Sequence, residues 1–123
     1  MKKFKFRLER VLNYREAIKT EKKTELAKKN AKLAEEEQRL EMLEEAFLNN
    51  EAIIDSSNAS ATSADMIRMA GMYAARLKNE IEKQHASIAN VKKAVEVARL
   101  AYIEAAKEAV TIKNISLKRM KSF

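Results

Sequence analysis

One stretch of the chain decides the fold: residues 67–112, which read IRMAGMYAARLKNEIEKQHASIANVKKAVEVARLAYIEAAKEAVTI. Taken in alternating steps of three and four, all of its fourteen positions are apolar except Gln84. An apolar seam of this period predicts a long helix that supercoils around a partner helix. The seam comprises Ile67, Ala70, Ala74, Leu77, Ile81, Gln84, Ile88, Val91, Val95, Ala98, Tyr102, Ala105, Ala109 and Ile112.

The first half of the chain carries a less regular seam. The same stepping from Leu8 to Ile54 includes an unbroken seven-residue repeat of Leu26, Leu33, Leu40, Phe47 and Ile54. Polar side chains at seam positions weaken helix pairing, although their long stems can still cover apolar surface. We therefore expect a looser pairing towards the N-terminus. The polar seam positions there are Arg15, Lys19, Lys22, Lys29 and Glu36.

Between the two seams, residues 55–65 read DSSNASATSAD, the one cluster of helix-ending residues in the sequence. Thr62-Ser63-Ala64-Asp65 fits a capping box at a helix start. We expect helix one over about 4–54, a connection over about 55–62 and helix two over about 63–120. A short connection makes the helices antiparallel neighbours, with residue n facing about position 119 − n. The fold class is therefore all-α, a long antiparallel two-helix coiled-coil hairpin that forms a single domain over residues 1–123.

Composition excludes most other classes of protein. The 123 residues include one Gly, one His, no Pro and no Cys, too few turn residues for a sheet fold and no thiolate for a metal or disulfide. No apolar run approaches the length of a membrane span, and the basic N-terminus lacks the apolar stretch of a secretory signal. We expect a soluble intracellular protein. It is not an enzyme, because a two-helix hairpin offers no pocket, and we expect no catalytic residue, metal, cofactor or small-molecule substrate.

Charge is unevenly placed along the chain. The net charge is +7 over residues 1–30, −6 over 31–58, +1 over 59–89 and +5 over 90–123. If the chain doubles back, its two ends form one pole of about +12, which favours an acidic partner. A solvated helix surface would explain the same charges without a partner.

Three segments could bind partners. Phe4-Lys5-Phe6-Arg7-Leu8 places two rings beside cations, and the rings diverge on a helix, so one is expected to be exposed. Packing of the rings over the end of the paired helices is the alternative. Met66, Met69, Met72 and Tyr73 form an adaptable apolar group, for which core packing is an equal alternative. The basic C-terminus, with Lys113, Lys118, Arg119 and Lys121, also suits a helix end whatever its function.

Two stretches resemble known proteins: residues 6–16, FRLERVLNYRE, and residues 73–84, YAARLKNEIEKQ. The first resembles the opening of the FliJ family of flagellar export proteins, and the second resembles the second helix of that family. The resemblance implies an antiparallel coiled coil similar to the central stalk of rotary ATPases. It also implies a cytoplasmic place in the flagellar type III protein export apparatus, peripheral at the cytoplasmic face of the membrane. The partners implied are the export ATPase FliI, the export gate protein FlhA and export chaperones.

On this view the two halves of the hairpin have different partners. The joined ends would enter the ATPase ring through Phe4, Phe6, Arg7, Leu8, Arg10, Lys113, Lys118 and Arg119. The gate and chaperones would contact Gln38, Leu43, Phe47, Tyr73, Leu77 and Gln84. Four of these also lie on the seam, where packing in the core is the alternative: Leu43, Phe47, Leu77 and Gln84.

Two other functions fit the pattern. A basic coiled coil could bind nucleic acid or an anionic membrane surface, which the charge supports, whereas interleaved acids and few aromatic residues argue against this alternative. A structural spacer or a homodimer is also consistent with the seam. Electrostatic binding to nucleic acid or a membrane should weaken strongly as salt rises, whereas docking through apolar anchors should weaken less.

Overall fold

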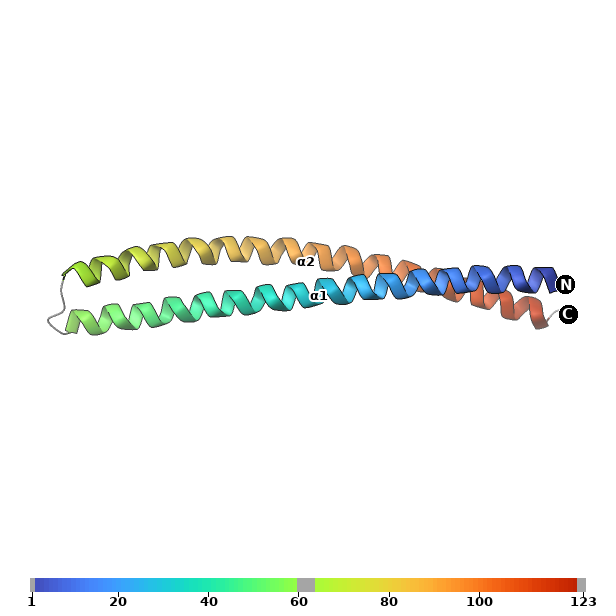
Figure 1. Cartoon of the computed structure of the whole chain (residues 1–123), viewed down its shortest axis with the longest axis horizontal. Helices are drawn as coiled ribbons and strands as arrows, with labels where there is room; N and C mark the ends of the chain where they lie inside the picture. The colour runs from blue at the N-terminus through green and yellow to red at the C-terminus, as the bar shows by residue number, and fades with distance from the viewer. Residues whose placement is uncertain (1, 60–63, 122–123) are drawn as a thin grey trace. The chain divides into compact units, whose positions relative to one another are not determined.

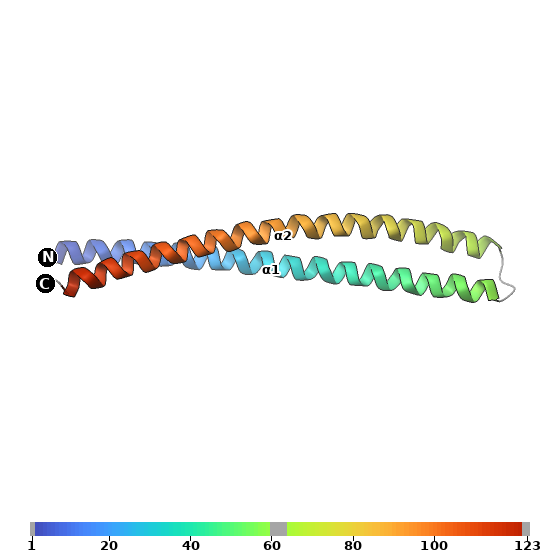
Figure 2. The same cartoon turned by 180° about the vertical axis from the view of Figure 1, so that it is seen from behind.

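The computed structural model describes residues 2–59 and 64–121, which form two α-helices: α1, Lys2–Ala59, and α2, Ala64–Lys121 (Figures 1 and 2). The chain folds as two units. The stem unit comprises Met1–Ala31 and Lys93–Phe123, and the hairpin unit comprises Lys32–Lys92. In each unit a segment of α1 packs antiparallel to a segment of α2. The predicted all-α antiparallel hairpin is confirmed, and the single domain over residues 1–123 stays a prediction.

Both helices are uninterrupted because nothing in them forces a turn. The sequence has no Pro, and no described residue has a positive φ angle. Gly71 lies within α2, and a Cβ added there would meet no atom within 4 Å. Its place in the sequence therefore does not reflect close helix packing.

The seam in α2 is confirmed along its whole length. All fourteen predicted positions are buried or half-buried, and small side chains fill much of the centre. In α1 every seam position from Leu8 to Ile54 is likewise shielded except Lys29, which is exposed. The core of each unit is thus one strip of contacts between two helices. Its buried apolar residues are Ala74, Leu77, Ile88, Ala98, Ala105 and Ala109.

The helix boundaries differ from the predicted ones at the connection. Helix α1 continues past Ile54 through Asp55 and Ser56 to Ala59. Ser and Asn cost a helix interior only fractions of a kcal/mol, so without Pro or Gly they do not stop it. The predicted capping residues Thr62 and Ser63 lie outside the described residues. Asp65 lies in the first turn of α2, where its charge suits the helix dipole.

The longer α1 also corrects the predicted register. The rule of about 119 − n pairs Glu36 with Lys83 and Arg15 with Glu104. In the structure, Glu36 contacts Gln84 and Arg15 contacts Glu108. Both contacts reach a residue of α2 later than the rule gives, by one position at Glu36 and by four at Arg15.

Candidate partner-binding surfaces

The stem unit brings the two basic segments of the sequence together. The guanidinium carbon of Arg119 lies 4.9 Å from the centroid of the Phe4 ring, which joins the end of α2 to the start of α1. Phe6 is 62% exposed, whereas Leu8 is half-buried in the seam. The remaining residues predicted to bind the ATPase are exposed: Arg7, Arg10, Lys113, Lys118 and Arg119.

The two units differ in the sign of their net charge. The stem unit contains eighteen Lys and Arg residues against seven Asp and Glu, a net charge of +11. The hairpin unit contains seven against eleven, a net charge of −4. Such a field in the stem unit attracts acidic partners over about 8 Å at physiological ionic strength.

The polar seam residues of the stem unit stay close to water. Arg15 donates from Nη1 to Glu108 Oε2 at 2.6 Å across the two helices, and the two side chains are 37% and 42% exposed. Arg15 Nε is buried and has no hydrogen-bond partner among the described residues. Lys19 and Lys22 form ion pairs within α1, with Glu16 at 4.0 Å and Glu25 at 3.7 Å. Such half-exposed ion pairs stabilise the helix pairing little.

In the hairpin unit, two of the residues predicted to bind the gate and chaperones face solvent. Gln38 is exposed, and Tyr73 is 38% exposed with the Arg76 guanidinium carbon 5.3 Å from its ring centroid. Leu43 is half-buried in the seam. Leu77, at 6% exposure, is buried and offers no surface to a partner, as packing in the core requires.

Phe47 lies at the border between the seam and the surface. The ring is half-buried, and Lys78 Nζ lies 5.8 Å from its centroid. A hollow beside it is lined by Phe47, Lys78, Ile81 and Glu82. Of the predicted gate and chaperone contacts, Phe47 and Tyr73 thus combine an aromatic ring with a neighbouring cation.

Gln84 is buried, and its contacts explain why a polar residue occupies the seam. Its Nε2 donates to the Glu36 backbone oxygen at 2.8 Å and to Glu36 Oε2 at 2.5 Å. Ser87 Oγ donates to the same carboxylate oxygen at 3.2 Å, and Lys32 Nζ lies 3.0 Å from Glu36 Oε1. The sequence places Gln84 among possible partner contacts, but here it serves the pairing of the two helices.

These contacts shift the ionisation of Glu36 and Lys32. The hydrogen bond from Gln84, followed by that from Lys32, lowers the pKa of the Glu36 carboxyl. The hydrogen bond to Glu36 raises the pKa of the Lys32 ammonium in return. Both shifts favour the ionised forms, so Lys32 and Glu36 form an ion pair beside Gln84.

Asn50 makes a second polar contact across the hairpin unit. Its side chain is in the seam at 8% exposure, and Nδ2 donates to the Ala70 backbone oxygen at 2.8 Å. A bond to one particular backbone oxygen is lost if the helices slide, so such a residue specifies the register. The heptad pattern places Asn50 on the seam, but it contains no signal for the acceptor.

Several exposed apolar side chains were missed by the sequence reasoning. In the stem unit the exposed ones on α2 include Val97, Leu100, Val110 and Leu117. The recurrence of Ile103, Val110 and Leu117 every seven residues on a face outside the seam was the available signal. In the hairpin unit the missed ones are Met42, Leu48 and Ile53. The apolar group predicted from the sequence, Met66, Met69 and Met72, is exposed rather than packed in the core.

Searches for metal-binding groups and membrane spans found no candidates. Across residues 2–59 and 64–121, no group of three His, Asp or Glu side chains is arranged to hold a metal ion. Over the same residues, neither helix has a stretch apolar enough to span a bilayer.

Comparison with known proteins gives one match. The family model described as flagellar FliJ protein matches residues 4–123. No curated protein and no solved structure matches the chain significantly.

Proposed function

The chain belongs to the FliJ family of flagellar proteins and is thus a component of the flagellar protein export apparatus, and from this premise we propose that it works as a non-enzymatic stalk and adapter. The stem unit docks into the ring of the export ATPase FliI. The hairpin unit contacts the export gate protein FlhA and export chaperones. The protein acts in the cytoplasm, peripheral to the membrane.

The observation that carries this proposal is the opposite charge of the two units. A net charge of +11 in the stem unit, with Phe6 62% exposed among the cations, suits an acidic opening with an apolar socket. The hairpin unit, at −4, presents Tyr73 and the hollow beside Phe47 instead. Two surfaces of opposite charge favour two different partners.

A crossed pair of substitutions tests the proposal. Phe6→Ala should lower affinity for the export ATPase by about 2 kcal/mol, as an interface anchor does, and leave binding of the gate protein unchanged. Tyr73→Ala should weaken binding of the gate protein or a chaperone and spare the ATPase. Isothermal titration calorimetry with each purified partner measures both.

Charge reversal supplies a second readout. Replacing Lys118 and Arg119 by Glu should slow association with the ATPase and reduce its dependence on salt, because rim charges mainly steer the encounter. The matched control replaces Arg39 and Lys92, exposed cations of the hairpin unit, by Glu. The proposal is wrong if the stem variants bind the ATPase at wild-type affinity while the hairpin-unit variants lose it.

A further inference from the structure

The end of the stem unit has an unusual composition. Residues 2–8 and 109–119 together contain seven Lys and Arg residues and no Asp or Glu. The contact between Arg119 and the Phe4 ring, at 4.9 Å, places the two segments against each other. The ends of the two helices are therefore neighbours, and we call residues 2–8 and 109–119 together the end surface.

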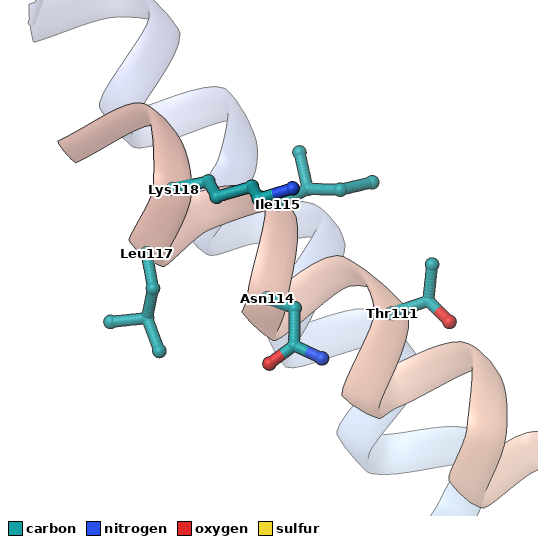
Figure 3. A pocket seen from close by; sticks show the side chains of 5 residues that line it. All are labelled: Thr111, Asn114, Ile115, Leu117 and Lys118. Atoms are coloured by element: carbon teal, nitrogen blue, oxygen red, sulfur yellow. The ribbon is translucent and has the colours of Figure 1, made fainter. Parts of the chain in front are cut away.

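Apolar side chains project from the end surface beside these cations. Phe6 is 62% exposed and Leu117 is 50% exposed. Leu117 lines a hollow on α2 with Thr111, Asn114, Ile115 and Lys118. Figure 3 shows Leu117 and Asn114 on one side of α2 and Ile115 and Lys118 on the other. Both helix ends thus carry exposed apolar side chains as well as cations, and on α2 Ile115 lies on the same side as Lys118.

Cations together with exposed apolar side chains favour one kind of anionic partner over another. A nucleic acid backbone attracts the lysines through its phosphates, which are charged and do not bind Leu or Ile side chains. The headgroup region of an anionic bilayer attracts the same lysines, while the acyl boundary below it accepts Phe, Leu and Ile. The long stems of Lys and Arg bridge the two levels, with the charge at the headgroups.

We propose that the end surface, residues 2–8 and 109–119, binds anionic lipid bilayers directly. Neither helix crosses the membrane, and the contact is peripheral. The same side chains enter the ATPase ring in the proposed function, so the chain makes the two contacts at different times. Lipid binding can be tested without the ATPase, because it needs only lipid and this chain. It gives the export component a route to the membrane surface without a protein partner.

Vesicle flotation with the full chain tests the proposal. The vesicles contain phosphatidylcholine alone or one part phosphatidylglycerol to two parts phosphatidylcholine. The protein should float with the anionic vesicles, remain behind with the neutral ones, and be released as salt rises. The double variant with Lys5→Gln and Lys113→Gln should bind the anionic vesicles about 25-fold less tightly, since each cation near the surface contributes about fivefold.

Matched controls separate the end surface from net charge and from general hydrophobicity. The double variant with Arg39→Gln and Lys92→Gln loses the same charge from the hairpin unit and should bind as wild type. Leu117→Ala should weaken vesicle binding severalfold, whereas Leu48→Ala, at a site 67% exposed in the hairpin unit, should not. Circular dichroism should show unchanged helicity in all four, because the altered side chains are exposed.

Three results would overturn the proposal. Equal binding to neutral and anionic vesicles would remove the role of the cations. Equal losses of vesicle binding in the end-surface and hairpin-unit variants would show that binding depends on net charge alone. Preference for a short DNA duplex over anionic vesicles at about 150 mM salt, where exposed charges are well screened, would identify nucleic acid as the partner instead.

Discussion

The hairpin unit and the stem unit share one seven-residue repeat but seat polar residues in it differently. In the hairpin unit, Asn50 and Gln84 are buried, and each bonds to a backbone oxygen of the opposite helix. In the stem unit, the polar seam residues are long cations at the edge of water, with Arg15 reaching Glu108. Short buried amides fix a register, whereas exposed cations leave the pairing loose and the charge available to a partner.

The largest effect should follow from a charge placed at a buried position of the seam. Ile88→Asp buries a carboxylate at a site only 7% exposed and should lower the free energy of unfolding by about 3–5 kcal/mol. Leu26→Asp, at a half-buried site in the stem unit, should cost less than half as much. Chemical denaturation followed by circular dichroism measures the free energy of unfolding of both variants. Equal losses of stability would contradict the proposed difference between the hairpin unit and the stem unit.

Removal of a buried amide tests the register contacts. Gln84→Ala leaves Glu36 without its main donor and should cost about 1–3 kcal/mol. The control is Lys19→Ala in the stem unit, expected to stay within about 0.5 kcal/mol of wild type. Thermal melting measures both variants. A neutral Gln84→Ala would mean that the amide does not hold the helices together.

The pH dependence of stability sharpens the role of Glu36. Because the pKa of this carboxyl is lowered in the folded state, its contribution is present above the ordinary value of 4.5 and is lost as pH falls through the folded pKa. Wild type should therefore exceed Glu36→Gln in stability at neutral pH, and the difference should shrink in acid. Thermal melts of both proteins across this range measure it. A difference in stability that stays constant with pH would contradict the lowered pKa of the Glu36 carboxyl.

The smallest effect is expected at the cross-helix ion pair of the stem unit. Glu108→Gln removes the charge that Arg15 contacts, and should cost about 0.5 kcal/mol at low salt and less at high salt. Denaturant titration at two salt concentrations checks this. A loss as large as that of Gln84→Ala would show that the stem unit is held as firmly as the hairpin unit.

Much of the fold follows from the period of the seam, because burial in a two-helix coil depends on a residue's place in the repeat. Ile81 and Val95 lie where the pattern places them, and Lys29, alone among the seam positions, is exposed. The register does not follow, because it depends on where α1 ends, and Ser56 and its neighbours do not stop the helix. A shift of a few residues then changes every predicted cross-helix partner.

The candidate surfaces follow only in part from the sequence. Phe6 and the cations around it are exposed because they lie outside the seam, which the repeat shows. That Arg119 lies over Phe4 depends on the register and is invisible in the sequence. Leu77 and Gln84 fit a family pattern for partner contacts, yet they are buried, because one pattern of residues can reflect both packing and binding.

Hydrogen–deuterium exchange of the chain with and without the export ATPase tests the central claim most directly. The claim is that the stem unit, rather than the hairpin unit, enters the ATPase ring. The account predicts slower exchange on binding in peptides from Met1–Ala31 and Lys93–Phe123, with Lys32–Lys92 unchanged. Protection confined to Lys32–Lys92 would contradict it.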